Sequence, residues 1–512
     1  MADSPNKSTR ILLISPHYRA PRGYKIDLTP PLGLAYIAAV LEREGYTVKI
    51  LDVVAEDFHN RLAMNYGYVR AGLSYEAIEH RISEFKPAVV GVSCLLSSQF
   101  QDMCNICQIA KEKCGVPITV VGGEHTSALP EESLEKHYID FVVIGEGEYT
   151  MRDLMRRISE GADYSDLDGL GFKKDGQIVV NPKTKFIENI DELPLPARHL
   201  LPMETYFKTN IPQSGTSAKS PNTPMMTSRG CPGRCVFCAT AGFWGNRQRA
   251  RSVRKVLDEM ETLVRDYGVR EIQFIDDNLT LNRDRAMALF NGMIERNLDL
   301  VWNTPQGIAV WGLDEEVLKK MKESGCYEIT LGIESGDPGV LKNIVKKSIP
   351  MDKIERIAKA ARKIGLITKG YFVVGLPGET LEQMNKTFEL AKRLRLDAVG
   401  IFIATPLPGT ELYRICKEKG YLKEGFSHER VNYARGNIET PDFTPRQVEQ
   451  LVSKNILRIN LGLLLRNPLR FFKKYFRIFF TNPGSLVKYV LFLLRESRAK
   501  EEQATSASSK LE

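Results

Sequence analysis

The chain has 512 residues, of which 43% are hydrophobic and 26% charged, as in an ordinary globular protein. This length exceeds what one hydrophobic core serves well, so about three domains are expected. The formal net charge of +8 comes from the end of the chain, because residues 451–500 hold eleven Lys and Arg against the single acid Glu496. No basic, aromatic-rich stripe occurs elsewhere, which argues against nucleic-acid binding.

The first residues and the cysteines indicate the cellular compartment. Residues 1–10 are polar and lack the apolar core of a signal peptide, which predicts a cytoplasmic protein. Nine cysteines in a chain of this size do not suggest the disulfide framework that small secreted domains need. In a reducing compartment, clustered cysteines are metal ligands or core residues.

A first α/β domain is predicted over residues 1–160. Short apolar runs, typical of buried strands, cover Arg10–Ser15, Thr47–Leu51, Ala88–Cys94, Ile118–Val121 and Phe141–Ile144. Between these runs lie four stretches whose apolar residues recur at helical spacing: Leu32–Glu44, Tyr75–Phe85, Ser98–Cys114 and Glu131–His137. This alternation predicts a doubly wound parallel sheet, whose ligands bind at the carboxyl ends of the strands.

A linker is expected over residues 161–222, because this region is rich in turn residues, with a small hairpin around Gly171–Val180. The β/α alternation resumes over residues 223–430. Six strands are predicted at Pro224–Ser228, Glu271–Ile275, Leu300–Thr304, Glu328–Gly332, Lys369–Val374 and Ala398–Ile403. Six units are two short of a closed eight-stranded barrel, so a partial (β/α)6 barrel is expected.

The segment Gly230-Cys-Pro-Gly-Arg-Cys-Val-Phe-Cys238 follows the first barrel strand. Soft thiolates select iron–sulfur clusters, zinc or copper(I). Cys231, Cys235 and Cys238 can ligate three irons of one cubane, which leaves the fourth iron without a protein ligand, whereas electron carriers normally use four cysteines. A zinc site would need a fourth Cys or His, and none stands between Cys238 and Cys326.

This Cys-x-x-x-Cys-x-x-Cys segment resembles the signature of the radical S-adenosylmethionine (SAM) superfamily. The resemblance implies a 4Fe-4S cluster whose open iron binds SAM and, once reduced by a donor such as flavodoxin or ferredoxin, cleaves it to a 5′-deoxyadenosyl radical. Phe237 sits where the family keeps an aromatic residue beside adenine. Further segments fall in order at the ends of predicted strands: Phe274–Asp277, Gly332–Gly336, Gly375–Glu379 and Thr405–Thr410.

Several polar residues and glycines at these strand ends are candidate SAM contacts. Glu334 can accept hydrogen bonds from ribose hydroxyls or an ammonium group, or can cap the next helix. Asp276 and Asp277 are weaker candidates, since Asp-Asp-Asn is also good turn chemistry. Gly375 and Gly378 let the backbone approach a ligand or form a plain turn.

The first domain resembles the cobalamin-binding domain that precedes the barrel in one large subgroup. The resemblance rests on Pro30–Ala35, Ser93–Leu95, Gly122–His125 and Ile144–Gly147, and it implies that Ser93, Gly122 and Gly123 make room for the nucleotide tail of cobalamin. The Asp-x-His-x-x-Gly loop of many such domains is incomplete here. Its histidine position is kept as His17 without the Asp and the Gly, so we expect no bond from His17 to cobalt.

Two further features have open interpretations. Cys104, Cys107 and Cys114 share one helical face, where cysteines usually pack as small hydrophobes rather than bind metal. The region 431–512 is predicted to be helical, basic and hydrophobic, with a disordered end. Residues 455–494 either form an interfacial membrane helix or pack on the barrel.

The sequence therefore predicts a cytoplasmic radical SAM enzyme, and the resemblance implies cobalamin-dependent methylation of an unactivated carbon in a small molecule or lipid. The alternatives are a radical cyclisation or oxidation, as in anaerobic porphyrin cyclases, and a non-catalytic cobalamin- or cluster-based sensor. The open iron argues against the sensor.

Overall fold

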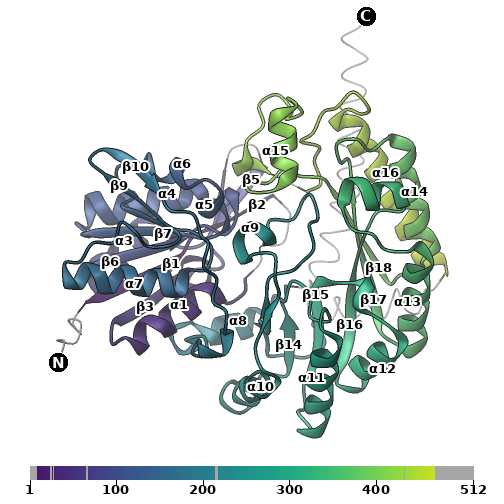
Figure 1. Ribbon diagram of the computed structural model, residues 1–512, viewed down its shortest axis with the longest axis horizontal. Helices are drawn as coiled ribbons and strands as arrows, with labels where there is room; N and C mark the ends of the chain where they lie inside the picture. Colours follow the sequence, from purple (N-terminus) through teal and green to yellow (C-terminus); the bar gives the residue numbers. More distant parts are fainter. Residues whose placement is uncertain are drawn as a thin grey trace, which may run out of the picture.

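The computed structural model describes residues 9–466, except 23–25, 27, 65–66, 214–216 and 432. Within this part of the chain, two α/β units lie side by side (Figure 1). The first contains a seven-stranded sheet in the order β10-β9-β8-β7-β6-β1-β3, and the second a six-stranded sheet in the order β11-β14-β15-β16-β17-β18. The α/β class, with a doubly wound sheet ahead of a partial barrel, is confirmed.

Five neighbouring strands of the first sheet are parallel, and β3 forms one edge of the sheet: β1 (Arg10–Ser15), β3 (Thr47–Asp52), β6 (Val89–Ser93), β7 (Ile118–Gly122) and β8 (Phe141–Val143). Alternate residues of β1 point to opposite faces of the sheet. Ile11 and Leu13 pack under α1 (Leu32–Arg43) and α7 (Gly147–Glu160). Leu12 and Ile14 pack under α3 (Tyr75–Phe85) and α4 (Phe100–Gln108).

Shorter elements complete the first unit. The strands β2 (Tyr18–Pro21), β4 (Arg61–Ala63) and β5 (Tyr68–Ala71) form a small sheet. Short helices are α2 (Val53–Glu56), η2 (Ser97–Gln99), η3 (Ile109–Lys113), α5 (Glu124–Ala128), α6 (Pro130–Leu134) and α8 (Met203–Thr209). The expected hairpin forms as β9 (Leu170–Lys174) and β10 (Gln177–Val180), and β9 pairs antiparallel with β8. The first sheet therefore continues into the region predicted to be a linker, while the predicted domain boundaries themselves stay a prediction.

All six strands of the second sheet are parallel: β11 (Asn222–Met225), β14 (Glu271–Phe274), β15 (Val301–Ala309), β16 (Cys326–Glu334), β17 (Ile367–Val374) and β18 (Ala398–Ile403). The helices between them are α10 (Val253–Tyr267), α11 (Arg283–Glu295), α12 (Glu315–Glu323), η7 (Val340–Val345), α13 (Met351–Ile364) and α14 (Leu381–Arg393). The apolar faces of these helices and strands share one core.

The start of the carboxyl-terminal region packs on the barrel. Helix α16 (Pro445–Arg466) contacts α14 and β18, and it buries Val448, Val452 and Ile459 in the barrel core. The described part of the tail thus follows the packing interpretation, whereas residues 467–494 lie outside the described residues. A search of the described residues finds no helix with the length and apolar character needed to cross a membrane.

Candidate active site

The three cysteines lie in a loop after the first barrel strand, between β12 (Ser228–Arg229) and α9 (Thr240–Trp244). Gly230 opens the loop at φ +82°, and a Cβ there would lie 2.4 Å from the carbonyl oxygen of Arg247. A Cβ at Gly233 would lie 3.3 Å from Sγ of Cys231 and 4.0 Å from Sγ of Cys235. The loop therefore bends two of its thiols around Gly233, and its first turn requires glycine at Gly230.

The chemistry of this donor set fits an iron–sulfur cluster. All three thiols are free, and Cys238 is exposed. Burial raises the pKa of Cys235 to about 12, against the opposing charge of Lys347. A thiol must lose its proton before its sulfur can bind a metal, so the affinity of these cysteines for iron is coupled to proton release. The cysteines stay the predicted cluster ligands.

Asp276 and Asp277 hold the loop in place from the end of β14. Asp277 accepts hydrogen bonds from the Gly230 amide at 2.9 Å and the Thr240 hydroxyl at 3.0 Å. Asp276 accepts from the amide of Thr227 at 2.7 Å and from the Ser228 hydroxyl at 2.6 Å. Both carboxylates therefore position the loop between β12 and α9 that carries the three cysteines, which we call the cluster loop.

Glu334 is paired with a lysine that the sequence analysis did not single out. It ends β16 at φ +70°, and its Oε1 accepts a hydrogen bond from Nζ of Lys347 at 2.8 Å. The same ammonium group donates to the Gly332 carbonyl at 2.8 Å and lies 5.5 Å from the Trp311 ring centre. The pair lies close enough to Cys235 that both charges influence the pKa of its thiol. A ribose or ammonium contact of Glu334 stays a prediction.

The glycines after β17 form a turn. Gly375 has φ +82° and Gly378 φ +88°, and the amides of Gly375 and Leu376 donate to Oε2 of Glu379 at 2.8 and 3.2 Å. Burial raises the pKa of Glu379 to about 8. A Cβ at Gly375 would meet Val448 of α16 at 3.2 Å. Turn geometry and helix packing thus explain Gly375, and ligand contacts of these glycines and of the half-buried Phe237 stay predictions.

The predicted cobalamin-binding residues lie together at the carboxyl end of the first sheet. Ser93 pairs with Gly122 across β6 and β7. Gly123 has φ +115°, and a Cβ there would lie 2.6 Å from the carbonyl oxygen of Cys94. A Cβ at Gly122 would lie 3.4 Å from the carbonyl oxygen and 3.8 Å from Cβ of Val143, which are ordinary van der Waals distances. Gly123 is therefore required by the fold, whereas Gly122 leaves room beside it.

His17 contacts a backbone carbonyl group and faces a buried carboxylate inside the first domain. Its ring is fully buried, and Nε2 lies 2.7 Å from the carbonyl oxygen of Leu73. The other ring nitrogen, Nδ1, faces the buried Asp102 at 3.8 Å. Both ring nitrogens thus face groups of the first domain, and the absence of a bond from His17 to cobalt stays a prediction.

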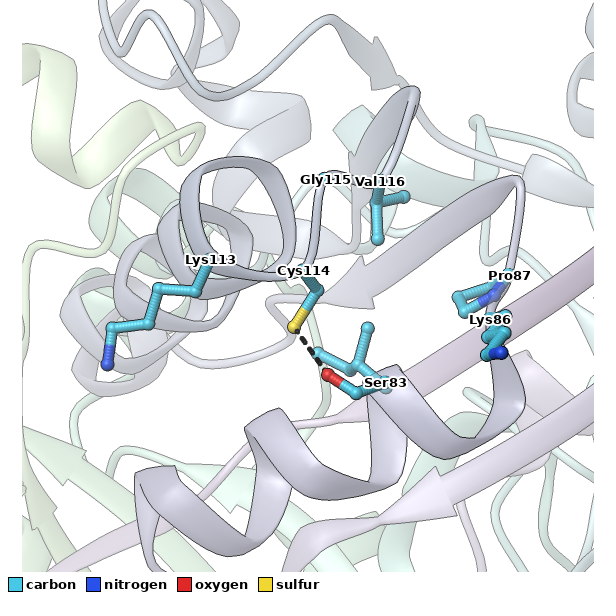
Figure 2. A pocket seen from close by; sticks show the side chains of 8 residues that line it. Ser83, Lys86, Pro87, Lys113, Cys114, Gly115 and Val116 are labelled. Carbon is cyan, nitrogen blue, oxygen red and sulfur yellow. Dashed lines mark hydrogen bonds between the residues drawn. The ribbon is translucent and has the colours of Figure 1, made fainter.

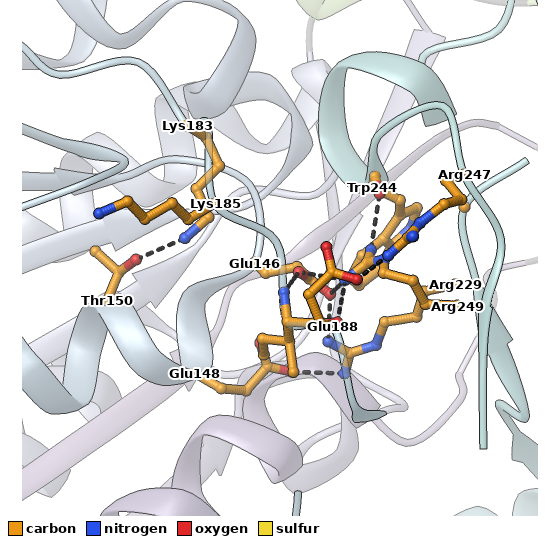
Figure 3. Close-up of polar contacts among 12 residues, drawn as sticks. Glu146, Glu148, Thr150, Lys183, Lys185, Glu188, Arg229, Trp244, Arg247 and Arg249 are labelled. Atoms are coloured by element: carbon orange, nitrogen blue, oxygen red, sulfur yellow. Dashed lines mark hydrogen bonds and ion pairs between the residues drawn. The ribbon is translucent and has the colours of Figure 1, made fainter. Parts of the chain in front are cut away.

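A buried ionic cluster joins the first domain to the cluster loop (Figure 3). Glu146 and Glu148 flank the start of α7, and Arg229 donates to Glu146 at 3.0 Å and to Glu148 at 2.6 Å. Arg249, on β13 (Arg249–Ala250), adds a contact to Glu146 at 2.7 Å. We name these four residues the interdomain ion cluster. Arg229 comes directly before Gly230 and Cys231, so the cluster loop is fixed against the first domain.

The carboxyl ends of the two sheets face each other. A Cβ at Gly145 would lie 3.3 Å from the carbonyl oxygen of Phe243 in α9, and one at Gly409 would lie 2.9 Å from Cβ of Ala128 in α5. Helix α9 lies between the two units in Figure 1. Burial and the nearby charge of Asp277 raise the pKa of Glu124 to about 7. The site thus combines the ends of both sheets.

The three cysteines that share one helical face, Cys104, Cys107 and Cys114, lie apart from this site. Cys104 and Cys107 are buried in the core of the first domain, and burial raises the pKa of Cys104 to about 11. Cys114 lines a small surface pocket with Ser83 and Val116 (Figure 2). That pocket lies beside the amino ends of β6 and β7, away from the carboxyl ends where doubly wound sheets bind ligands.

A three-cysteine loop after the first strand of a parallel partial barrel, facing the ligand-binding end of a doubly wound sheet, defines a two-domain radical SAM enzyme. The profile of the Radical SAM superfamily matches residues 225–391, and that of the B12 binding domain matches residues 27–155.

Curated relatives extend over most of the chain. It is 34% identical to cytidylyl-2-hydroxyethylphosphonate methyltransferase of Streptomyces wedmorensis, over 87% of this chain and 89% of that one. It is 28% identical to the anaerobic magnesium-protoporphyrin IX monomethyl ester cyclase of Rubrivivax gelatinosus, over 95% of this chain and 82% of that one. The chain belongs to the family of radical SAM methyltransferases that carry an amino-terminal B12-binding domain, and it is an enzyme.

Solved structures share the fold. The methyltransferase TsrM of Kitasatospora setae, solved with cobalamin and a [4Fe-4S] cluster bound, matches with a TM-score of 0.64 at 20% identity, over 80% of this chain and 78% of that one. The cobalamin-dependent radical enzyme OxsB, solved with aqua-cobalamin bound, matches with a TM-score of 0.67 at 14% identity, over 96% of this chain and 76% of that one. These matches agree with the two-domain arrangement.

Proposed function

We propose that this enzyme methylates an unactivated carbon of a small molecule at the junction of its two sheets. The observation that carries the proposal is the apposition of the two carboxyl ends, where Gly145 approaches Phe243 and Gly409 approaches Ala128. Cys231, Cys235 and Cys238 would hold the 4Fe-4S cluster on one side. Ser93, Gly122 and Gly123 would line the cobalamin site on the other.

When bound, the cluster and SAM supply a 5′-deoxyadenosyl radical, and cobalamin supplies a methyl group. The chain's own residues orient and shield these groups. Asp277 and the interdomain ion cluster hold the cysteine loop at a fixed position relative to Gly122. Glu334 and Lys347 place a buried ion pair beside Cys235, where Glu334 can receive a hydrogen bond from SAM. Fixed positioning of this kind keeps a radical away from solvent and side reactions.

The substrate class follows from the relatives. The relative of higher identity acts on a cytidylyl phosphonate, whereas the cyclase relative is less similar, which favours a methyltransferase with a small-molecule substrate. A flavodoxin or ferredoxin is the proposed electron donor. Contact with a membrane through residues 455–494 stays a prediction, and the packing of Ile459 in the barrel core limits it to the residues that follow.

Cobalamin binding tests the proposal directly. Replacing Gly122 with leucine should reduce bound cobalamin from about one per chain to less than about a tenth, because the new side chain fills the space beside the strand end. Room for a Cβ at Gly122 means that the fold and the cluster should survive. Cobalamin absorbance and iron content, measured after anaerobic reconstitution and gel filtration, report the two sites separately.

Gly462→Leu provides a matched control, since nothing lies within 4 Å of a Cβ at that position on α16. This variant should bind cobalamin like the wild type. Normal cobalamin content in Gly122→Leu would show that the site is misplaced. If cluster-loaded wild-type protein takes up no cobalamin, methyl transfer through cobalamin is excluded.

A further inference from the structure

Two histidines and a glutamate meet beside the first sheet, and one of the histidines comes from a distant part of the chain. His125 lies in α5, Glu132 in α6 and His428 in the single turn η8 (His428–Arg430), which follows α15 (Glu411–Glu418). Their ligand atoms all lie within 4.8 Å of one another. Figure 1 shows α5 and α6 on the side of the first unit that is near α15.

One ring nitrogen of the buried His125, Nε2, lacks a hydrogen-bond partner in the described part of the chain. The residue as a whole is 2% exposed. The nearest carboxylate oxygen of Glu132 lies 3.9 Å away, which is too far for a hydrogen bond. A buried polar atom of this kind costs about 1–3 kcal/mol when it stays unpaired. Its direction, toward a carboxylate and a second imidazole, indicates an ion between them.

The surroundings prepare His125 to act as a ligand. Ser97 Oγ lies 3.0 Å from Nδ1, so a proton on Nδ1 satisfies both groups and leaves the lone pair of Nε2 facing Glu132. The ring is also held 4.8 Å from the ring of Phe100, centre to centre.

The distances suit a transition-metal ion. A tetrahedral ion with ligands at about 2.0–2.2 Å holds its ligand atoms roughly 3.3–3.6 Å apart. Here Oε1 of Glu132 lies 3.6 Å from Nε2 of His428, and Oε2 of Glu132 lies 3.9 Å from Nε2 of His125. Taken as one ligand atom from each residue, the three atoms lie within 4.8 Å of one another, so the side chains would close in when an ion binds. Two imidazoles and one carboxylate form a set that zinc accepts, with a fourth position left for water. Glu132 and His428 are partly exposed, so an ion can enter.

We infer that His125, Glu132 and His428 bind a divalent transition-metal ion, with Zn²⁺ the ion that fits, and that this ion ties the first domain to the segment after the barrel. The site uses none of the three cluster cysteines. The inference does not rest on the proposed function, although His125 belongs to the segment Gly122–His125 on which the cobalamin resemblance rests. Its test reads zinc content and zinc ligands rather than methyl transfer.

The test uses full-length protein whose cluster has been reconstituted, so that the cysteines are already occupied. One equivalent of Zn²⁺ is added, and the gel-filtered protein is examined by elemental analysis and zinc-edge X-ray absorption. We expect one zinc per chain, with nitrogen and oxygen ligands at about 2.0–2.2 Å and no sulfur shell near 2.3 Å. His428→Ala and Glu132→Gln should each weaken binding more than about 100-fold, since even the loss of a residue that hydrogen-bonds to a metal ligand costs about 10–100-fold.

The control is His137→Ala, which removes an exposed histidine paired with Glu112 at 2.8 Å and should leave zinc binding unchanged. Zinc should raise the melting temperature of the wild type and of His137→Ala, but not that of His428→Ala. The inference is overturned if the wild type retains no zinc, if the zinc has sulfur ligands, or if folded His428→Ala retains it equally well. Normal zinc binding in a Gly122→Leu protein that has lost cobalamin would support two separate sites.

Discussion

Cys235→Ala should remove the cluster and with it the ability to cleave SAM. Loss of one of three thiolates leaves a second iron without a protein ligand, so iron should fall from about four atoms per chain to less than about one. Formation of 5′-deoxyadenosine should drop by at least about 1,000-fold, because the cofactor supplies the chemistry. Iron and sulfide analysis and mass spectrometry of the nucleoside products provide the measurements.

The matched control is Cys114→Ala, which removes a half-buried thiol at the surface pocket, away from the barrel. It should retain iron, brown colour and nucleoside formation. The ligand assignment would be wrong if a protein with Cys231, Cys235 and Cys238 all changed to alanine kept full iron and sulfide.

Arg229→Met should destabilise the folded protein by about 3–5 kcal/mol, because removing one partner of a buried ion pair leaves the other charge uncompensated. The Arg229 side chain is 2% exposed, and it is the partner of Glu148 at 2.6 Å, while Glu146 retains Arg249. Its guanidinium group also lies 4.7 Å from the ring centre of Trp244. Thermal and urea unfolding of anaerobic protein should show the loss.

Arg247→Met is the control, since that arginine is 69% exposed and pairs with Glu188 on the surface. An exposed pair contributes about 0–1 kcal/mol, so this variant should unfold almost like the wild type. Adding Glu148→Gln to Arg229→Met should recover part of the stability, because the stranded charge is removed. Equal stability of Arg229→Met and Arg247→Met would contradict the role given to the interdomain ion cluster.

Regular elements with a clear apolar pattern were predictable from the sequence. The strand Arg10–Ser15 and the helix Tyr75–Phe85 have the predicted bounds, and the six barrel strands occur in the predicted order. Both depend on local periodicity, which a sequence displays directly. The helix α7 was not predicted, because the segment Ile144–Gly147 that leads into it was interpreted only through its resemblance to a cobalamin-binding domain.

Long-range partners were not predictable. Glu146 and Arg229 are 83 residues apart, and no local pattern joins them. Lys347 also escaped notice, since a lone lysine after a helix is usually solvated, and only the fold brings it to Glu334 and Cys235. The hairpin β9–β10 was expected, but its pairing with β8 depends on the edge of a sheet formed more than 25 residues earlier. Such contacts depend on tertiary structure rather than propensity.

The proposed function is tested most directly by the products that the reconstituted enzyme makes from SAM. Cobalamin- and cluster-loaded wild-type protein, reduced anaerobically and supplied with SAM, should form both 5′-deoxyadenosine and S-adenosylhomocysteine. Cys235→Ala should lose the first product, and Gly122→Leu should lose the second. Formation of 5′-deoxyadenosine alone by fully loaded wild-type protein would contradict methyl transfer and would favour a cyclase-like radical reaction.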